Sequence, residues 1–274
     1  MKKQKLHNDV LMPIIGLGTF RSKDEDAYHA VLAALEAGYR HIDTAAVYGN
    51  EEEVGRAIKD SKVKRKDLFV TTKIWNTEQG YRKSLKQFNE SLQKLGLEYV
   101  DLLLIHWFKS YDKTRRTWNA FETLYDMGKV KAIGVSNFNV HHLQYLLDNA
   151  NIKPMVNQVE THIHLQNHFL HDFCKKNGIQ LEAYAPLMSH HIDELLENET
   201  MKEIADKYGK TIPQIAIRWL TQREIVVIPK SIHKKRIKEN FDIFDITIED
   251  EDMEKINTLN KGRKYFPEFD NVNF

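Results

Sequence analysis

Short runs of β-branched and apolar residues recur along the chain, and most of them end in a polar side chain. Between them, apolar residues return at steps of three and four, which is the spacing of a helix with one buried face. The segment 81–96 shows this spacing with Leu85, Phe88, Leu92 and Leu95, and it stops at Gly96. The chain therefore alternates strands and helices. Eight runs are predicted as strands: 14–19, 39–44, 68–73, 100–106, 132–137, 155–160, 179–184 and 225–231.

Polar residues mark the beginnings of two predicted helices. Asp24 precedes a helix expected over about 27–37, and Thr77 and Glu78 precede the helix 81–96. Because such side chains accept hydrogen bonds from the first turn of a helix, we expect them to be N-terminal caps.

Strands that alternate with helices favour parallel pairing, and eight such units in about 250 residues predict a (β/α)8 barrel, the TIM-barrel fold of the α/β class. A doubly wound sheet is the alternative, but residues 16–21 hold only two of the three glycines of a dinucleotide fingerprint. Residues 5–13 read as a β-hairpin that plugs the amino end of the barrel. Extra helices are expected after Pro186 and after Asn240. Because no segment has the Pro/Gly/Ser-rich composition of a linker, residues 1–274 are predicted to be one domain.

Composition narrows the class of partner. The 274 residues are 42% hydrophobic and 29% charged, which is typical of a globular protein. Forty basic and 39 acidic residues give a net charge of +1, so nothing calls for nucleic acid or an anionic membrane. The single cysteine, Cys174, cannot form an intramolecular disulfide, and no apolar run has the length of a signal peptide or membrane span. We expect a cytoplasmic monomer.

Four polar residues stand where a parallel barrel places its functional face, at the carboxyl ends of strands. Asp43, Lys73 and His106 lie at the ends of the second, third and fourth predicted strands, and Tyr48 follows five residues after Asp43. Each alone has an ordinary explanation, such as a helix cap or a packed ring. Together they would converge on one small volume and form a proton-donating site.

A phenol is a poor acid at neutral pH because its ordinary pKa is about 10. An adjacent Lys73 ammonium would lower the pKa of Tyr48, while Asp43 would hold that ammonium in place. A neutral His106 would orient a carbonyl oxygen beside the phenol. Since no side chain supplies a hydride, carbonyl reduction at this site implies a nicotinamide cofactor over the barrel mouth.

Eight ordered strings over nearly the whole chain resemble the aldo-keto reductases: GLGTF, GYRHIDTAAVYGNE, TKIWN, LGLEYVDLLLIHW, GKVKAIGVSNF, VNQVETH, AYAPL and IPKS followed by RIKEN. The resemblance implies a barrel that reduces aldehydes and ketones to alcohols with NADPH. Tyr48 is then the general acid, tuned by Lys73 and Asp43, and His106 positions the carbonyl. Length and compact loops look most like the bacterial glyoxal reductase and 2,5-diketo-gluconate reductase branch, so small aldehydes, dicarbonyls and keto sugars are the expected substrates.

The resemblance also assigns a cofactor site. It implies that Ser136, Asn137 and Gln158 hold the nicotinamide amide and that Tyr184 stacks on the ring. Further cofactor contacts are implied for Gly18, Thr19, Asp43, Ala185 and Leu187.

A basic stretch near the eighth strand resembles the family's site for the adenosine 2′-phosphate. The residues implied are Lys230, Ser231 and Arg236 for the phosphate, and Glu239 and Asn240 for the adenine. His233 stands where many relatives carry arginine, and a largely neutral imidazole would hold a phosphate less strongly. We therefore expect NADPH as cofactor, with NADH accepted at lower efficiency.

Aromatic residues lie beside the proposed acid. Phe20, Trp75, Asn76 and Trp107, with Tyr48 and His106, would form an aromatic-walled substrate pocket that has one polar handle. In the resembling family, the loop after His106 and the C-terminal loop, here 261–274, shape specificity.

Two other functions remain to be weighed. A metal-dependent hydrolase is one alternative, suggested by a group of histidines: His162, His164, His168, His171, His190 and His191. Their spacing does not require the side chains to meet at one point, and no metal ligand stands at the end of the first strand. We therefore predict no metal site. The stronger alternative is an NADPH-binding regulatory subunit with little turnover, and the complete set of four polar residues speaks against it.

Overall fold

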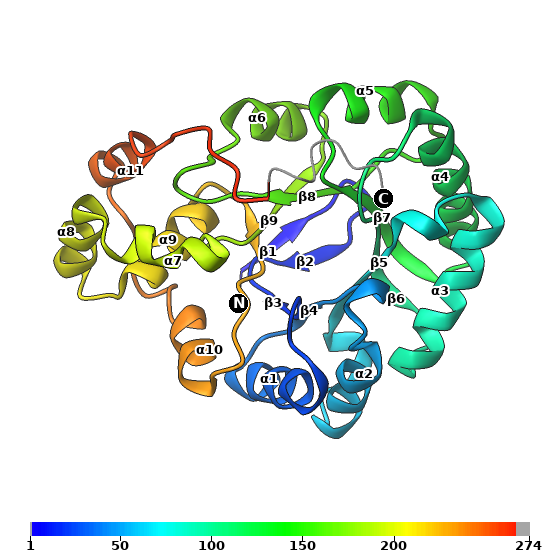
Figure 1. Ribbon diagram of the computed structural model, residues 1–274, viewed down its shortest axis with the longest axis horizontal. Helices are drawn as coiled ribbons and strands as arrows, with labels where there is room; N and C mark the ends of the chain where they lie inside the picture. Colours follow the sequence, from blue (N-terminus) through cyan, green and yellow to red (C-terminus); the bar gives the residue numbers. More distant parts are fainter. Residues whose placement is uncertain (1, 267–274) are drawn as a thin grey trace.

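A closed barrel of eight parallel strands lies at the centre of the molecule (Figure 1). The computed structural model describes residues 2–266. Strands β3 to β10 pair in chain order, and bridges from Ile15 to Val227 and from Gly18 to Lys230 join the last strand to the first. The barrel strands are β3 (Leu17–Gly18), β4 (His41–Asp43), β5 (Phe69–Ile74), β6 (Val100–Ile105), β7 (Val130–Ser136), β8 (Val156–Glu160), β9 (Gln180–Tyr184) and β10 (Val226–Val227). The predicted (β/α)8 fold is confirmed.

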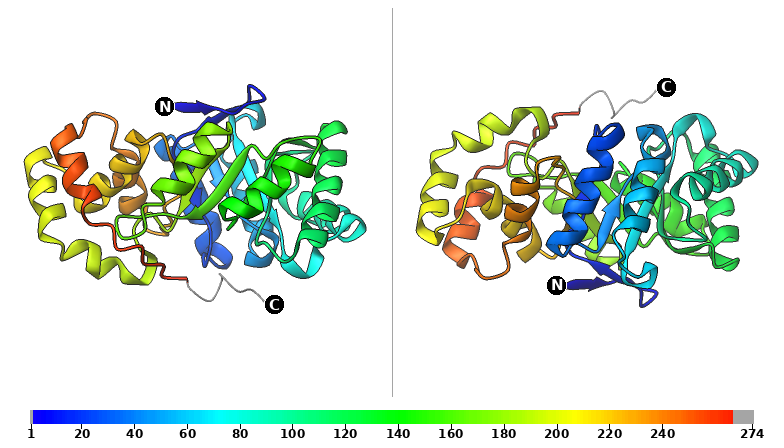
Figure 2. Two further views of the ribbon diagram at one scale, coloured as in Figure 1. Left: turned by 90° about the horizontal axis from the view of Figure 1, so that it is seen from above. Right: turned by 90° about the horizontal axis from the view of Figure 1, so that it is seen from below.

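Helices surround the barrel and bury their apolar faces against it (Figures 1 and 2). None of the helices in the described part of the chain is long and apolar enough to cross a bilayer. The extra helices expected late in the chain are α7 and α8, after β9, and α11. The helices are α1 (Asp24–Ala37), α2 (Glu51–Asp60), α3 (Tyr81–Leu95), α4 (Tyr111–Asp126), α5 (Val140–Asn149), α6 (His168–Lys176), α7 (Ile192–Leu196), α8 (Glu199–Tyr208), α9 (Ile212–Gln222), α10 (Lys234–Phe241) and α11 (Asp250–Asn257).

The predicted hairpin closes the amino end of the barrel. It consists of β1 (Lys3–Lys5) and β2 (Leu11–Pro13), which pair antiparallel. The Asn8 side chain in its turn donates to the carbonyl of Lys131, 2.9 Å away at the start of β7, and Met12 is fully buried. The hairpin therefore covers the end of the barrel opposite the carboxyl ends of the strands.

The predicted helix caps are wrong. Helix α1 already begins at Asp24 and has Lys23 at its N-cap, so Asp24 lies in the first turn. There its negative charge interacts favourably with the positive end of the helix dipole. Thr77 and Glu78 belong to a separate 3₁₀ helix, η3 (Asn76–Glu78). Helix α3 starts after Gly80, whose φ of 121° allows a reversal of the chain that other residues adopt with strain.

Candidate active site

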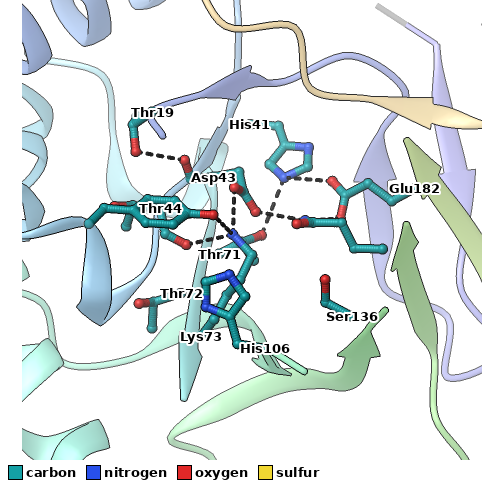
Figure 3. A network of polar contacts seen from close by, with 12 residues as sticks. Thr19, His41, Asp43, Thr44, Thr71, Thr72, Lys73, His106, Ser136 and Glu182 are labelled. Carbon is teal, nitrogen blue, oxygen red and sulfur yellow. Dashed lines mark hydrogen bonds and ion pairs between the residues drawn. The ribbon is translucent and has the colours of Figure 1, made fainter. Parts of the chain in front are cut away.

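The ends of three neighbouring strands bring the four predicted polar residues together. Asp43 ends β4, Lys73 lies near the end of β5, and His106 directly follows β6. Tyr48 comes from the 3₁₀ helix η1 (Ala46–Tyr48) in the loop after β4. Figure 3 shows the side chains of Asp43, Lys73 and His106 close together, and the Tyr48 hydroxyl lies 3.3 Å from Nζ of Lys73. Sequence position along each strand was sufficient to predict this convergence, because parallel strands end on the same face.

A buried ion pair occupies the middle of the site. The Nζ atom of Lys73 lies 2.6 Å from Oδ1 of Asp43 and donates to the backbone oxygen of Thr44 at 2.9 Å. Neither Lys73 nor Asp43 is more than 2% exposed. Burial alone would lower the pKa of Lys73, but its interactions with neighbouring acidic groups, Asp43 first, outweigh burial, and the pKa lies above its ordinary value. Lys73 is therefore a permanent ammonium.

The phenol of Tyr48 receives a hydrogen bond from this ammonium, with Nζ of Lys73 3.3 Å from the hydroxyl oxygen. From the sequence we expect the Lys73 ammonium to lower the pKa of this phenol. In the structure burial raises the pKa of Tyr48 by more than the charge of Lys73 lowers it, so the net pKa is raised. The predicted effect of Lys73 is therefore present, but burial outweighs it, and the phenol keeps its proton at neutral pH.

His106 is the neutral neighbour of this phenol. Burial and the charge of Lys73 hold the pKa of His106 well below its usual range. Its ring lies edge-on to Tyr48, with centroids 5.6 Å apart. Edge-on contact with Trp75 at 5.0 Å and a parallel arrangement with Trp107 at 6.1 Å fix the imidazole from the other sides.

The residues assigned to the nicotinamide lie beside this group. Ser136 and Gln158 pair in register across β7 and β8, and both are buried. The Asn137 amide donates to Oγ of Ser136 at 3.0 Å and to the carbonyl of His106 at 3.1 Å. The Tyr184 hydroxyl donates to Oδ1 of Asn137 at 2.9 Å. Amide and hydroxyl groups of this kind suit a carboxamide.

Two buried residues of the same network escaped the sequence reasoning. Glu182 lies within β9 and His41 begins β4, and both are fully buried. Oε2 of Glu182 accepts from Nε2 of Gln158 at 2.8 Å, and that same nitrogen donates to Oδ2 of Asp43 at 2.8 Å. A charged residue inside an apolar strand was the available signal for Glu182.

The strand ends β3 and β10 position the residues assigned to the rest of the cofactor. Gly18 lies against Ile228, where an added Cβ atom would be 2.7 Å from the backbone oxygen. Thr19 donates through Oγ1 to the backbone oxygen of Asp43 at 2.9 Å. Ala185 has a φ of 47° and accepts a turn hydrogen bond from the backbone nitrogen of Met188 at 2.9 Å, which sets the loop that contains Leu187.

The basic stretch begins after β10. Lys230 and Arg236 are exposed and form no ion pair with another residue that the structure describes, whereas Lys234 pairs with Glu36 at 2.7 Å. Ser231 is 7% exposed and accepts from the backbone nitrogen of His233 at 3.1 Å. The remaining assigned residues, Glu239 and Asn240, lie on α10, with Asn240 buried. Cations without a protein partner suit a bound phosphate.

The predicted substrate wall is present in part. Phe20 is 42% exposed and its ring lies 5.0 Å from that of Tyr48, so it borders the acid from the solvent side. Trp75 and Trp107 flank His106. Asn76 differs from these, because it is buried and its Oδ1 accepts from Nε2 of Gln79 at 3.3 Å.

The C-terminal segment reaches the barrel mouth. Phe266 packs edge-on against Tyr184, with centroids 5.7 Å apart. The backbone nitrogen of Tyr265 donates to Oε1 of Glu160 at 2.7 Å, and its hydroxyl lies 2.8 Å from Nδ1 of His164. The loop expected to shape specificity spans 261–274, and its part 267–274 lies outside the described residues.

Three of the histidines considered as metal ligands each have a polar contact with another side chain. His162 contacts Glu160 at 2.9 Å, His164 contacts Tyr265, and His168 contacts Gln166 at 2.8 Å. Within residues 2–266, no group of three or more histidine, cysteine or acidic side chains has the arrangement of a metal site. Burial raises the pKa of the Cys174 thiol to about 12, which makes it a poor nucleophile.

Comparison with known proteins gives the same family as the motifs. The family model described as "Aldo/keto reductase family" matches residues 14–261. The glyoxal reductase of Bacillus subtilis is 52% identical over 271 residues, which cover 98% of this chain and 97% of the relative. A solved aldo-keto reductase from a Medee basin deep-sea metagenome library has a TM-score of 0.98 and 70% identity, covering 99% of this chain and 100% of that one. The Bombyx mori aldo-keto reductase, solved in complex with NADP, has a TM-score of 0.89 and 35% identity, covering 96% and 94%. This chain belongs to the aldo/keto reductase family and is an oxidoreductase that reduces carbonyl compounds.

Proposed function

We propose that this enzyme uses NADPH to reduce small aldehydes and α-dicarbonyls, such as glyoxal and methylglyoxal, and short keto sugars. The observation that carries the proposal is the hydrogen-bonded series Asp43, Lys73 and Tyr48, with separations of 2.6 and 3.3 Å, next to a neutral His106. The 52% identity to a glyoxal reductase supports the substrate class.

The chain itself supplies the proton. Tyr48 holds a proton on its hydroxyl oxygen at the mouth of the barrel and gives it to the carbonyl oxygen of the substrate. Lys73 then stabilises the phenolate by its charge, and Asp43 keeps the ammonium in place. His106, being neutral, orients the carbonyl oxygen toward Tyr48 through its imidazole.

The cofactor residues fit a nicotinamide dinucleotide. NADPH, when bound, supplies the hydride that no side chain can provide. Ser136, Asn137 and Gln158 offer the donors and acceptors that a carboxamide requires, and the Tyr184 ring is half-exposed beside them. Lys230 and Arg236, which form no ion pair within residues 2–266, suit the 2′-phosphate that distinguishes NADPH from NADH. We propose that NADH is used less efficiently than NADPH, and that His233 makes this preference for NADPH smaller than an arginine at the same position would.

The mouth favours small substrates. Phe20, Trp75 and Trp107 supply aromatic surface beside Tyr48, and Phe266 approaches from the C-terminal segment to contact Tyr184. Aromatic walls around one polar group bind the apolar part of a short carbonyl compound, and its carbonyl oxygen is then free to contact the Tyr48 hydroxyl. We further propose that the enzyme is a cytoplasmic monomer and that residues 1–274 form one catalytic domain.

The test is steady-state consumption of NADPH with methylglyoxal by the wild type and by Tyr48→Phe. Removing the acid should lower kcat by a factor on the order of 10² to 10⁴, because that is the usual contribution of a positioned proton donor, while NADPH affinity stays near the wild-type value. Tyr28→Phe is the matched control, since its hydroxyl contacts Asp60 at 2.9 Å on the outer helices. Normal turnover by Tyr48→Phe would refute the assigned role, and NADPH binding without turnover on any carbonyl compound would favour a regulatory subunit.

A further inference from the structure

Glu182 is a buried carboxyl group that the proposed proton transfer does not use. It lies on β9 in register with Gln158 of β8 and is fully buried. Oε2 is 2.8 Å from Nε2 of Gln158, and Oε1 is 3.5 Å from Nε2 of His41. The groups in direct contact with this carboxyl are thus the Gln158 amide and the His41 imidazole, and Figure 3 shows His41 beside Glu182.

Neither of these contacts supplies a positive charge. Burial lowers the pKa of His41 to about 3, so its ring is neutral. The ammonium of Lys73 is held by Asp43 at 2.6 Å. A carboxylate buried without a cation is costly, whereas the protonated acid is not. Burial, followed by the charge of Asp43, raises the pKa of Glu182 to about 8, in agreement with this geometry.

The same carboxyl, together with that of Asp43, determines how the Gln158 amide is oriented. Nε2 of Gln158 lies 2.8 Å from Oδ2 of Asp43 and 2.8 Å from Oε2 of Glu182. Both neighbours are oxygens that accept, so the NH₂ group must face them. The oxygen of the amide is then turned away from both carboxyl groups. Gln158 therefore presents an acceptor on the side away from the two carboxyl groups, and Ser136 is its neighbour in register on β7.

We propose that Glu182 is a positioning residue that acts as a neutral carboxylic acid and orients the Gln158 amide so that its oxygen receives the NH₂ group of the nicotinamide carboxamide. This inference deepens the proposed function and rests on it for the identity of the ligand. The carbonyl oxygen of Glu182 accepts from Gln158, and the hydroxyl faces His41. Glu182 thus acts through Gln158 and touches no reacting atom.

The first experiment measures the Kd of NADPH by quenching of protein fluorescence in Glu182→Gln and Glu182→Leu. A glutamine side chain has the shape of a neutral glutamic acid, with an oxygen for Gln158 and an NH₂ group for His41, so its Kd should stay within about threefold of wild type. Leucine removes the acceptor, and NADPH should bind about tenfold more weakly, as expected for one lost buried hydrogen-bond partner. Wild-type affinity in Glu182→Leu, or a larger loss in Glu182→Gln than in Glu182→Leu, would overturn the proposal.

A double variant separates orientation of Gln158 from general damage. Once Gln158→Leu has removed the amide, adding Glu182→Leu should weaken NADPH binding no further, because the two residues act as one unit. An additional loss of the full size seen in the single Glu182→Leu variant would show that Glu182 acts by another route and would refute the inference.

A second readout needs no cofactor. The unfolded acid ionises above its ordinary pKa of 4.5 while the folded acid keeps its proton to about 8, so Glu182 costs the wild type increasing stability as pH rises between these values. The melting temperature of Glu182→Gln minus that of wild type should therefore increase by several degrees from pH 4.5 to pH 8. The groups that face Glu182, namely Asp43 and His41 on β4, Lys73 on β5 and Tyr48 on η1, are common to both proteins and cancel in the difference. A difference that does not vary with pH would refute the neutral acid.

The outcomes distinguish this inference from the proposed function. If wild type does not bind NADPH, the proposed function fails, whereas the melting experiment still decides the state of Glu182. If wild type binds NADPH and Glu182→Leu binds it equally well, only the inference fails. Should Glu182→Leu not fold, the affinity and melting profile of Glu182→Gln decide the question.

Discussion

Replacing Lys73 with methionine tests the buried ion pair most directly. At 2.6 Å, two unit charges attract by about 6 kcal/mol with an effective dielectric constant of about 20, and the cost of removing both from water offsets much of this. Lys73→Met leaves the Asp43 carboxylate buried without its cation. Such a loss costs about 3–5 kcal/mol of unfolding free energy. At about 2–4 °C per kcal/mol, the melting temperature should fall by about 10 °C.

The companion variant is Lys73→Met with Asp43→Asn, since it removes both charges and keeps a neutral acceptor for Gln158. Calorimetric melting should show that the double variant recovers at least half of the stability lost in Lys73→Met, because the cost lies in the unpaired charge. Lys5→Met is the matched control. Its ion pair with Asp9 has a similar separation of 2.7 Å but is exposed, so the melting temperature should not change measurably.

Additive losses in the double variant would refute this reasoning, as would a Lys73→Met protein that melts at the wild-type temperature. Turnover is a separate readout. Both variants should lose most of their carbonyl reduction, because the phenolate of Tyr48 then forms without a neighbouring cation. Recovery of stability without recovery of activity would separate the structural effect of the pair from its effect on the acid.

Three further predictions concern cofactor preference, stability at acidic pH and closure of the barrel. Arg236→Ala should raise the KM of NADPH about tenfold and leave the KM of NADH unchanged. His233→Arg should lower the KM of NADPH. Steady-state kinetics with each cofactor measure both effects. Burial lowers the pKa of His171 to about 4, so the unfolded chain takes up its proton first and stability declines as pH falls from about 6.5 to about 4. Melting curves of His171→Asn should show a smaller decline, and an identical profile would exclude His171 as a cause. Gly18→Ala would place Cβ 2.7 Å from the Ile228 oxygen and should lower the unfolding free energy by about 1–3 kcal/mol in urea titrations, whereas a fully stable variant would mean that β3 and β10 separate freely.

The positions of the strand ends were predictable because the apolar runs locate the strands, and parallel strands end on the same face of the barrel. Asp43, Lys73 and His106 each follow an apolar run, so their meeting at one mouth requires only that the barrel close. Family motifs then add assignments, such as Tyr184 and Arg236, that no spacing rule provides.

What sequence could not provide depends on three-dimensional surroundings. The net pKa of Tyr48 is set by burial as well as by Lys73, and burial is a property of the packed fold. Glu182 was missed because a carboxyl within an apolar strand can point to either side of the sheet, and only the register with Gln158 shows its partner. The cap at Asp24 was misplaced because polar side chains suit both the N-cap and the first turn of a helix.

The hairpin at the amino end of the barrel has a practical consequence for attaching the enzyme to a surface. Lys3 and Lys5 are exposed on it, and Figure 2 shows this end of the chain on the side of the molecule opposite the last described residues. Tyr48, Tyr184 and Phe266 lie at the other end of the strands. Immobilisation or fusion through the hairpin would therefore leave the mouth facing the solution, whereas attachment after Phe266 would begin at the mouth itself.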